Sequence, residues 1–327
     1  MTKANMVEQI LANAVRGEGI SLEEANILIN PDIANLDSLV HTANLLTRRV
    51  FGNKISMCAI YPAKVGLCSG DCAFCAQSAY NKCGVSPVLV SNLDEDGIIC
   101  NAKELYRAGV RRYSLVTSGE HLTNLEFDRL LHIFQRINTE TKIGICASLG
   151  SLTPERGSRL KQVGVSRYHH NIETSRSFFS QICSTHSYND KMSTIHIARQ
   201  AGLEICSGGI IGMGETPAQR VEMAFALKEL DVDCIPVNIL NSIPGTRLEK
   251  QSPLATDAIL RTIAVFRLLL PNKTLTFAGG REKALGPEEY RGYAAGINAA
   301  LVGNYLTTSG KAFAEEIQGL KAAGFDF

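Results

Sequence analysis

Three closely spaced cysteines are the residues of this chain best suited to metal chemistry. Cys68, Cys72 and Cys75 follow the pattern C-x3-C-x2-C, which is compact enough for one short loop to surround an iron-sulfur cube. Thiolates are soft ligands that suit iron and zinc, but the sequence lacks the second C-x2-C pair of a structural zinc site. Three protein ligands leave one iron of a four-iron cube open to a small chelating molecule. The motif therefore predicts a 4Fe-4S cluster with an open iron.

An alternative interpretation is that the three cysteines are buried and act as small hydrophobic residues. Glycine, serine and aspartate lie between them. These residue types favour a turn-rich loop over a core strand, and this favours metal ligation.

Composition and charge narrow the class of partner. The chain has 327 residues, 45% of them hydrophobic, so it can bury a large core. Thirty-three basic and 32 acidic residues give a formal charge of +1, which does not favour binding to nucleic acid or to an anionic membrane. No apolar run approaches the roughly 20 residues of a membrane span, and the N-terminus lacks the apolar core of a secretory signal. We therefore expect a cytoplasmic protein with a small-molecule partner, in which the ten cysteines serve metal ligation better than disulfides.

The remaining sequence alternates short apolar runs with longer helical stretches and has no linker or composition break. We predict one domain over residues 1–327, with an N-terminal helical extension over 1–50 and a barrel over 51–327. Ser21 and Glu24 have the spacing of a capping box in the extension. Eight alternating strands and helices favour a (β/α)8 TIM-type barrel of the α/β class. The predicted strands are Lys54–Ile60, Arg112–Val116, Lys142–Ala147, Ser166–Asn171, Leu203–Ile211, Cys234–Leu240, Thr274–Ala278 and Asn298–Gly303.

Residues of unusual type fall near the carboxyl ends of these predicted strands, where barrel enzymes carry their catalytic groups. The cysteine motif follows the first strand. The others are Ser118, Gly119 and Glu120 after the second strand, Cys146 in the third, Asn171 and Glu173 at and after the fourth, Cys206 in the fifth, Asn238 in the sixth and Arg281 after the seventh. We expect them to converge on one cavity.

The sequence resembles the radical S-adenosylmethionine enzymes, and among them the biotin synthase family, from about residue 40 to the end. The resemblance rests on the order and spacing of several stretches. They are GLCSGDCAFCAQSA around the cysteine motif, RYHHNIETS at 167–175, STHSY at 184–188, CSGGIIGMGET at 206–216, IPVNILNSIPGTRLE at 235–249 and AGGRE at 278–282.

The resemblance implies a full barrel, usually dimeric, that binds S-adenosylmethionine at the open iron and generates a 5′-deoxyadenosyl radical. It implies dethiobiotin as the substrate, an auxiliary iron-sulfur cluster as the sulfur source, and a flavodoxin- or ferredoxin-type electron donor. A closed barrel interior would protect the radical from quenching by water-borne hydrogen donors.

The resemblance also implies roles for individual residues. Asn171 and Glu173 would contact the adenosyl ribose or the substrate, and Asn238 would bind the ureido ring of dethiobiotin, because an amide offers both a donor and an acceptor. The alternative for Asn238 is a cap at the strand end. Residues 118–120 would lie near the methionine ammonium, or would form an ordinary loop.

Cys146, Cys206 and Arg281 match auxiliary-cluster ligands of the family. The alternatives are a core cysteine for Cys146 and a salt-bridged arginine at the barrel end for Arg281. Two departures stand out. Ser114 follows Tyr113 where the family has a third auxiliary cysteine, and Glu173 stands where the family has the shorter aspartate.

Loss of the ligand at Ser114 suggests a replacement elsewhere in the chain. Cys83 lies in a Lys-Cys-Gly turn shortly after the radical-cluster motif, in a loop that could fold over the barrel mouth. We predict it as the leading substitute, and a plain loop thiol is the alternative. Cys58, Cys100, Cys183 and Cys234 are the remaining cysteines.

Two other functions compete with sulfur insertion. A mutase or cofactor maturase of the same barrel type would have no need of Cys146, Cys206 and Arg281. A non-catalytic iron-sulfur carrier or sensor would leave Asn238 and the glycine-rich strand ends unexplained.

Overall fold

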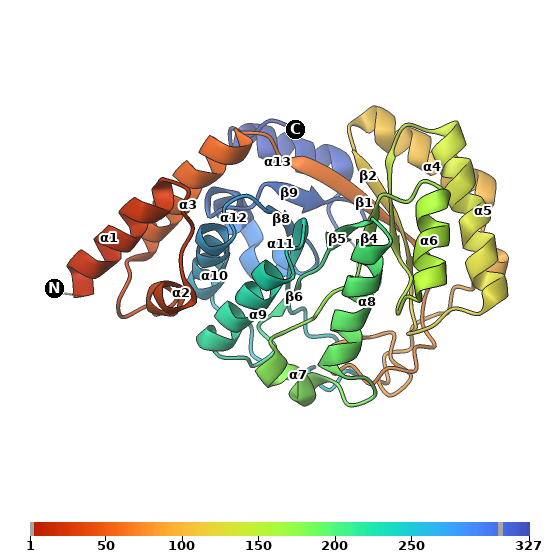
Figure 1. The fold of residues 1–327 in the computed structure, drawn as a ribbon, viewed down its shortest axis with the longest axis horizontal. Helices are drawn as coiled ribbons and strands as arrows, with labels where there is room; N and C mark the ends of the chain where they lie inside the picture. Colours follow the sequence, from red (N-terminus) through yellow and green to blue (C-terminus); the bar gives the residue numbers. More distant parts are fainter. Residues whose placement is uncertain (1–2, 307–309) are drawn as a thin grey trace.

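The computed structural model describes residues 3–306 and 310–327. Parallel strands form a closed barrel surrounded by helices (Figure 1). In the described part of the chain the order around the sheet is β5-β4-β3-β2-β1-β9-β8-β7-β6, and pairing of β5 with β7 closes it. The strands are β1 Ser56–Lys64, β2 Arg112–Thr117, β3 Gly144–Ser148, β4 Arg167–His169, β5 Glu204–Cys206, β6 Gly209–Ile211, β7 Cys234–Ile239, β8 Thr274–Phe277 and β9 Ala299–Leu301. The predicted (β/α)8 barrel is confirmed.

The fifth predicted strand, Leu203–Ile211, is two short strands in the structure. Between β5 and β6 the backbone of Gly208 lies so close to Pro236 that an added Cβ would stand 2.1 Å from the Pro236 carbonyl oxygen. A side chain could not fit there, and the glycine allows the chain to step past β7. β5 and β6 together occupy one of the eight barrel positions.

Helices follow the strands and cover the outside of the barrel. Thr123, Thr153 and Thr216 are N-caps of three of these helices, and each accepts a backbone hydrogen bond that the first turn would otherwise leave unmade. The helices beyond the N-terminal extension are α4 Glu95–Ala108, α5 Asn124–Glu140, α6 Pro154–Gln162, α7 Arg176–Ile182, α8 Tyr188–Gln200, α9 Pro217–Glu229, α10 Thr256–Leu269, α11 Arg281–Leu285, α12 Glu289–Ala294 and α13 Phe313–Ala322.

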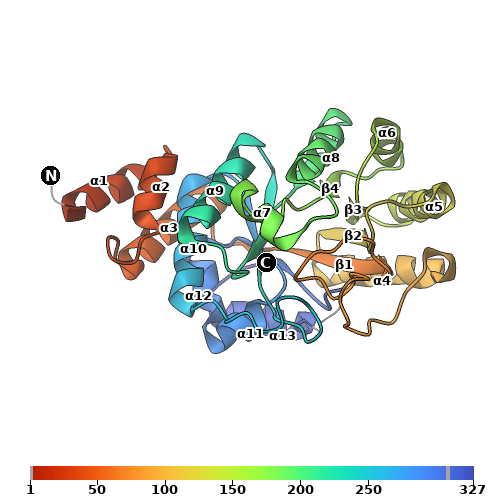
Figure 2. The ribbon, with the colours of Figure 1, turned by 90° about the horizontal axis from the view of Figure 1, so that it is seen from below.

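The N-terminal segment consists of α1 Lys3–Val15, α2 Leu22–Leu28 and α3 Leu36–Phe51. The capping box of Ser21 and Glu24 is present at the start of α2. These helices lie on one side of the barrel, against α9, α10 and α12, while α5 and α6 lie on the opposite side (Figures 1 and 2). Their buried faces join the barrel helices in one continuous hydrophobic core that extends from Val7 to Phe325.

Within the described residues no helix has both the length and the apolar character needed to cross a membrane.

Candidate active site

The cysteine motif forms a compact loop after β1. Cys68 and Gln77 are bridged by a backbone hydrogen bond of 3.1 Å, and the Asn81 side chain donates to the carbonyl oxygens of Cys72 and Cys75 at 3.1 and 2.8 Å. Burial raises the pKa of the Cys75 thiol to about 11. The loop folds so that Cys75 lines the barrel cavity. Three thiols in one rigid turn fit the donor set of an iron-sulfur cluster.

Asp71 ties this loop to the segment between α7 and α8. Its carboxylate accepts hydrogen bonds from the backbone N–H groups of Ser184 and Thr185 at 2.9 and 3.1 Å and from their hydroxyls at 2.6 and 3.0 Å. Burial alone would raise the pKa of Asp71, but these hydrogen bonds lower it well below its ordinary value. Arg247 donates to the Asp71 and Ile182 carbonyl oxygens at 2.7 and 3.0 Å. The cysteine loop is therefore held from both sides.

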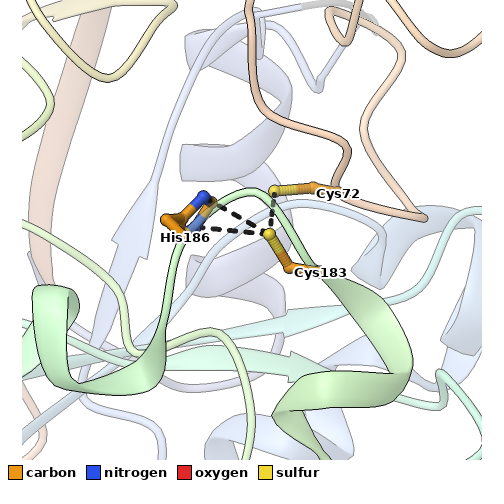
Figure 3. A group of neighbouring side chains, drawn as sticks. All are labelled: Cys72, Cys183 and His186. Atoms are coloured by element: carbon orange, nitrogen blue, oxygen red, sulfur yellow. Dashed lines mark hydrogen bonds between the residues drawn. The ribbon is translucent and has the colours of Figure 1, made fainter.

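The same segment brings Cys183 beside the cluster motif. Its sulfur lies 4.0 Å from the Cys72 sulfur and 3.3 Å from Nδ1 of His186 (Figure 3). The hydrogen bond with Cys72 lowers the pKa of Cys183 to about 4. Nothing in the sequence pattern indicated that these side chains meet.

The barrel encloses a cavity of about 500 Å³. Four cysteines from different strands line it, namely Cys58 of β1, Cys146 of β3, Cys206 of β5 and Cys234 of β7. Cys206 and Cys234 are register partners across the β5–β7 contact. Burial raises the pKa of Cys58 to about 12, and the nearby Cys234 and Cys146 thiols add to the shift. The structure thus gathers Cys146 and Cys206, as predicted, and adds two cysteines that the sequence analysis did not select.

Cationic side chains accompany these thiols. Arg112 and Arg167 both line the cavity, and both pair with Glu204, at 2.7 and 2.8 Å. A hydrogen bond from Cys206 and the positive charge of Arg167 contribute to lowering the pKa of Cys234 to about 6. Positive charge beside several thiols favours their deprotonated, metal-binding form.

Ser114 lies in the same part of the cavity. It is the register partner of Cys146 on the neighbouring strand, and its buried hydroxyl has no hydrogen-bond partner among the described residues. A buried polar atom without a partner is costly, so this position suits a bound group. His169 also contributes a nitrogen here, because its Nδ1 atom lies 3.3 Å from the Cys206 sulfur.

Asn171 and Glu173 line the cavity, as the sequence analysis expected. Asn171 accepts a hydrogen bond from the Gly208 N–H at 3.1 Å and donates to Glu173 at 3.4 Å. Glu173 has a φ of 67°, a conformation rare for residues other than glycine. Burial raises the pKa of its carboxyl group. The backbone at this position is held in an uncommon state that turns the carboxyl group inward.

Asn238 also lines the cavity, but the backbone already engages its amide. Nδ2 donates to the Gly209 carbonyl at 3.2 Å, and Oδ1 accepts from the Gly279 N–H at 3.0 Å. The predicted alternative, a cap at the strand end, is therefore present. An amide has two N–H donors and two lone pairs on oxygen, so one donor and one acceptor stay free for a ligand.

Residues 118–120 support the cysteine loop from outside the cavity lining. The Ser118 hydroxyl donates to the Gly66 carbonyl at 2.7 Å, and the Glu120 carbonyl accepts from the Ser151 N–H at 2.7 Å. Gly119 has a φ of 91°. None of the three is among the residues that line the cavity in the described chain. The loop alternative is the arrangement observed.

Arg281 is the predicted auxiliary ligand that follows the seventh predicted strand. The sequence analysis expected it beside the auxiliary cluster, but its side chain lies outside the cavity lining formed by the described residues. Its guanidinium is 1% exposed and lies 3.0 Å from Glu316 Oε2. Strand β8 ends at Phe277, and Arg281 begins α11 and pairs with Glu316 of α13, although its charge still acts to lower the pKa of Cys58 in the cavity. The predicted alternative of a salt-bridged arginine at the barrel end describes its place.

Cys83 is the predicted substitute for the ligand missing at Ser114. It lies in the loop after the cysteine motif, and the neighbouring Lys82 N–H donates to the Gly245 carbonyl at 3.0 Å. The loop does approach the barrel mouth, but Cys83 is half-buried and is not among the residues that line the cavity in the described chain. Chain connectivity places it near the cysteine motif, whereas the four cysteines that line the cavity from the strands lie on β1, β3, β5 and β7.

Comparisons with known proteins agree with this architecture. Residues 65–227 match the Radical SAM superfamily, and residues 236–326 match the Biotin and Thiamin Synthesis associated domain. The chain is 45% identical to biotin synthase of Acetivibrio thermocellus, over 95% of this chain and 96% of that protein. It is 41% identical to biotin synthase of Carboxydothermus hydrogenoformans, over 98% of each chain.

Two solved structures share the fold at low sequence identity. Methylornithine synthase superposes with a TM-score of 0.81 at 17% identity, covering 97% of this chain and 96% of that one. The FeFe-hydrogenase maturase of Carboxydothermus hydrogenoformans superposes with a TM-score of 0.81 at 18% identity, covering 98% of this chain and 79% of that one. These two likenesses establish the barrel architecture alone. The identities of 41–45% over nearly the whole length do more, and they show that this chain belongs to the biotin synthase family of radical S-adenosylmethionine enzymes.

Proposed function

We propose that the chain converts dethiobiotin to biotin by radical S-adenosylmethionine chemistry, with sulfur supplied inside the barrel. The observation that carries this proposal is one cavity lined by two sets of thiols, namely Cys75 alone from the motif and Cys58, Cys146, Cys206 and Cys234 from the strands. Cys75 lines its mouth, in the loop beyond β1, while Cys58 lies near the start of β1. The strand from Cys58 to its end at Lys64 rises by about 20 Å at ~3.3 Å per residue, which leaves room for a small substrate between the two sets.

Cys68, Cys72 and Cys75 would hold the 4Fe-4S cluster. When bound, this cluster supplies the electron that cleaves S-adenosylmethionine and so gives the 5′-deoxyadenosyl radical. The chain itself holds the three thiols in place through Asp71 and Asn81. The barrel wall restricts access of water to the cavity, which protects a reactive species from quenching.

Cys58, Cys146, Cys206 and Cys234 would hold the auxiliary cluster that is the sulfur source. This set gives four thiolates without Ser114, Cys83 or Arg281. Four thiolates satisfy the usual ligand count of an iron-sulfur cluster. Arg112 and Arg167 would offset their negative charge in the buried site.

Asn171, Glu173 and Asn238 line the same cavity and would orient the adenosyl group and the substrate. The free donor and acceptor of the Asn238 amide match the C=O and N–H groups of a cyclic urea. Fixed contacts to Gly209 and Gly279 would hold that amide in one orientation, so little conformational entropy would be lost when the substrate binds.

The proposal includes a flavodoxin- or ferredoxin-type electron donor, a homodimer and a cytoplasmic location. The family resemblance is the support for all three. Sedimentation of the cluster-loaded protein tests the dimer, and S-adenosylmethionine cleavage driven by reduced flavodoxin or ferredoxin tests the donor.

The decisive experiment measures 5′-deoxyadenosine with and without dethiobiotin under anaerobic conditions. Dethiobiotin should stimulate cleavage of S-adenosylmethionine and give biotin. Cys75→Ser should abolish cleavage while the barrel stays folded, because an oxygen ligand binds the soft iron poorly. If the rate of S-adenosylmethionine cleavage is the same with and without dethiobiotin and no biotin forms, the substrate assignment is overturned.

A further inference from the structure

Cys72, Cys183 and His186 form a cluster of metal-binding side chains that the proposed reaction does not use as a unit. Cys72 comes from the cysteine loop, whereas Cys183 and His186 come from the segment between α7 and α8 (Figure 3). One ligand atom from each residue lies within 4.8 Å of the other two. Among the described residues this is the one group of three or more histidine, cysteine or carboxylate side chains that meets the geometric requirement for a single ion.

The distances match a tetrahedral ion. Bond lengths of about 2.3 Å to sulfur and 2.0–2.1 Å to nitrogen place two thiolates about 3.8 Å apart, and a thiolate and an imidazole about 3.5 Å apart. The structure has 4.0 Å between the two sulfurs, and 3.3 and 3.6 Å from the Cys183 sulfur to the two ring nitrogens of His186. The two edges that meet at Cys183 are therefore close to those of a tetrahedral ion, and the edge from Cys72 to His186 is no longer than 4.8 Å.

Neighbouring groups hold these ligands in position. The Cys183 sulfur lies 3.2 Å from Asp71 Oδ1, and the residue is 4% exposed. The His186 ring packs edge-on against Phe179, with 5.8 Å between ring centroids. Partners behind the ligands are typical of metal sites, because they fix the orientation of the ligands.

We propose that the cluster-free chain binds one divalent transition-metal ion of the zinc or ferrous type through Cys72, Cys183 and His186. Binding displaces the thiol proton of Cys72, and water fills the fourth position of the tetrahedron. Two thiolates and an imidazole suit either ion. Because Cys72 also belongs to the proposed 4Fe-4S ligand set, a tightly held zinc ion would block cluster loading.

The test uses the full-length chain, freed of iron and sulfide and kept anaerobic, with Co²⁺ as the probe. A background of Cys206→Ser and Cys234→Ser prevents binding in the barrel cavity. We expect one Co²⁺ with thiolate charge-transfer absorption and tetrahedral visible bands. Cys72→Ala, Cys183→Ala and His186→Ala should each weaken binding by roughly 10-fold or more.

The matched controls are Cys68→Ala and Cys75→Ala, which remove cluster ligands and should leave Co²⁺ affinity within about 2-fold of the background, since neither is a ligand of this ion. If these two variants lose the ion while Cys183→Ala keeps it, the ion sits on the C-x3-C-x2-C motif and the proposal fails. Circular dichroism establishes that each variant is folded.

A second measurement needs no substitution in the barrel. Preloading the otherwise unmodified chain with one equivalent of Zn²⁺ should slow the appearance of iron-sulfur absorption during reconstitution, and Cys183→Ala should largely remove this delay. An equal delay in both proteins would overturn the proposal. Neither result depends on dethiobiotin or on cleavage of S-adenosylmethionine, so failure here is distinct from failure of the proposed function.

Discussion

Replacing Arg281 with leucine should destabilise the fold and leave the iron content of the barrel cavity unchanged. The arginine is 1% exposed, and its partner Glu316 is fully buried, with 3.0 Å between Nη2 and Oε2. Removing one partner of a buried ion pair costs about 3–5 kcal/mol, because the other charge is left without compensation. Tyr293 still donates to Glu316 at 2.5 Å. We therefore expect the free energy of unfolding to fall by about 3 kcal/mol, the lower end of this range.

Urea unfolding of the cluster-free chain, followed by circular dichroism, measures this loss. The double variant Arg281→Leu/Glu316→Leu should recover much of the free energy of unfolding, because neither charge is left alone in the core. Arg291→Ala breaks an exposed pair with Glu288 and is the matched control, with an expected change below about 1 kcal/mol. If Arg281→Leu keeps its stability but loses iron from the cavity, Arg281 is a cluster ligand and our account of its position is refuted.

Three further predictions concern Asp71 in the cysteine loop, the proposed substrate contact of Asn238, and Cys83. Asp71→Asn should lower the free energy of unfolding by about 2 kcal/mol at pH 7, because hydrogen bonds to a charged acceptor become neutral ones. Because the pKa of Asp71 is lowered in the folded state, its hydrogen bonds contribute fully to the free energy of unfolding above the unfolded pKa near 3.9, and this contribution is lost progressively as the pH falls below that value. A stability difference between Asp71→Asn and wild type that is as large at pH 2–3 as at pH 7 would contradict this explanation. Asn238→Ala should raise the dethiobiotin concentration for half-maximal stimulation of cleavage roughly 10-fold, from the ~1–3 kcal/mol cost of unpaired buried polar groups, and an unchanged concentration argues against contact with the substrate. Cys83→Ala should retain full iron content and biotin formation, and loss of either would restore it as a ligand candidate.

Much of the fold follows from local patterns that the sequence makes visible. The apolar runs predicted all of the barrel positions, and the Ser21 and Glu24 spacing predicted a capping box that is present. The fifth strand was predicted as continuous, although Glu204, Ser207 and two glycines interrupt its apolar residues. The break at Gly208 depends on the close approach of Pro236, a contact between segments distant in sequence.

The cavity cysteines show where sequence reasoning stops. Cys58 and Cys234 were recognised as strand residues, but strand periodicity gives the face of a residue and not its neighbour on the next strand. The β5–β7 contact places Cys234 beside Cys206, and that contact exists only once the barrel closes. Two cysteines on predicted strands, both away from the motif loop, were the available signal.

The surroundings of Arg281 and Cys83 could not be predicted from the sequence for a related reason. Each lies close in sequence to residues of the site, but Arg281 begins a helix that carries its side chain to Glu316. Cys83 stays in the outer loop beside Gly245. Side-chain direction at the barrel mouth depends on the tertiary path of each loop, which spacing alone does not encode.

The central claim is that four strand cysteines hold the sulfur-donating cluster. Iron and sulfide analysis of a chain that lacks Cys68, Cys72 and Cys75, after anaerobic reconstitution, tests it most directly, because any cluster that remains belongs to the barrel cavity. We predict that this background still assembles an iron-sulfur cluster, and that adding Cys58→Ala, Cys146→Ala, Cys206→Ala or Cys234→Ala removes most of its iron and sulfide, whereas adding Cys100→Ala, at an exposed helix position, changes neither. Full iron and sulfide in the Cys58→Ala and Cys234→Ala proteins would contradict the account.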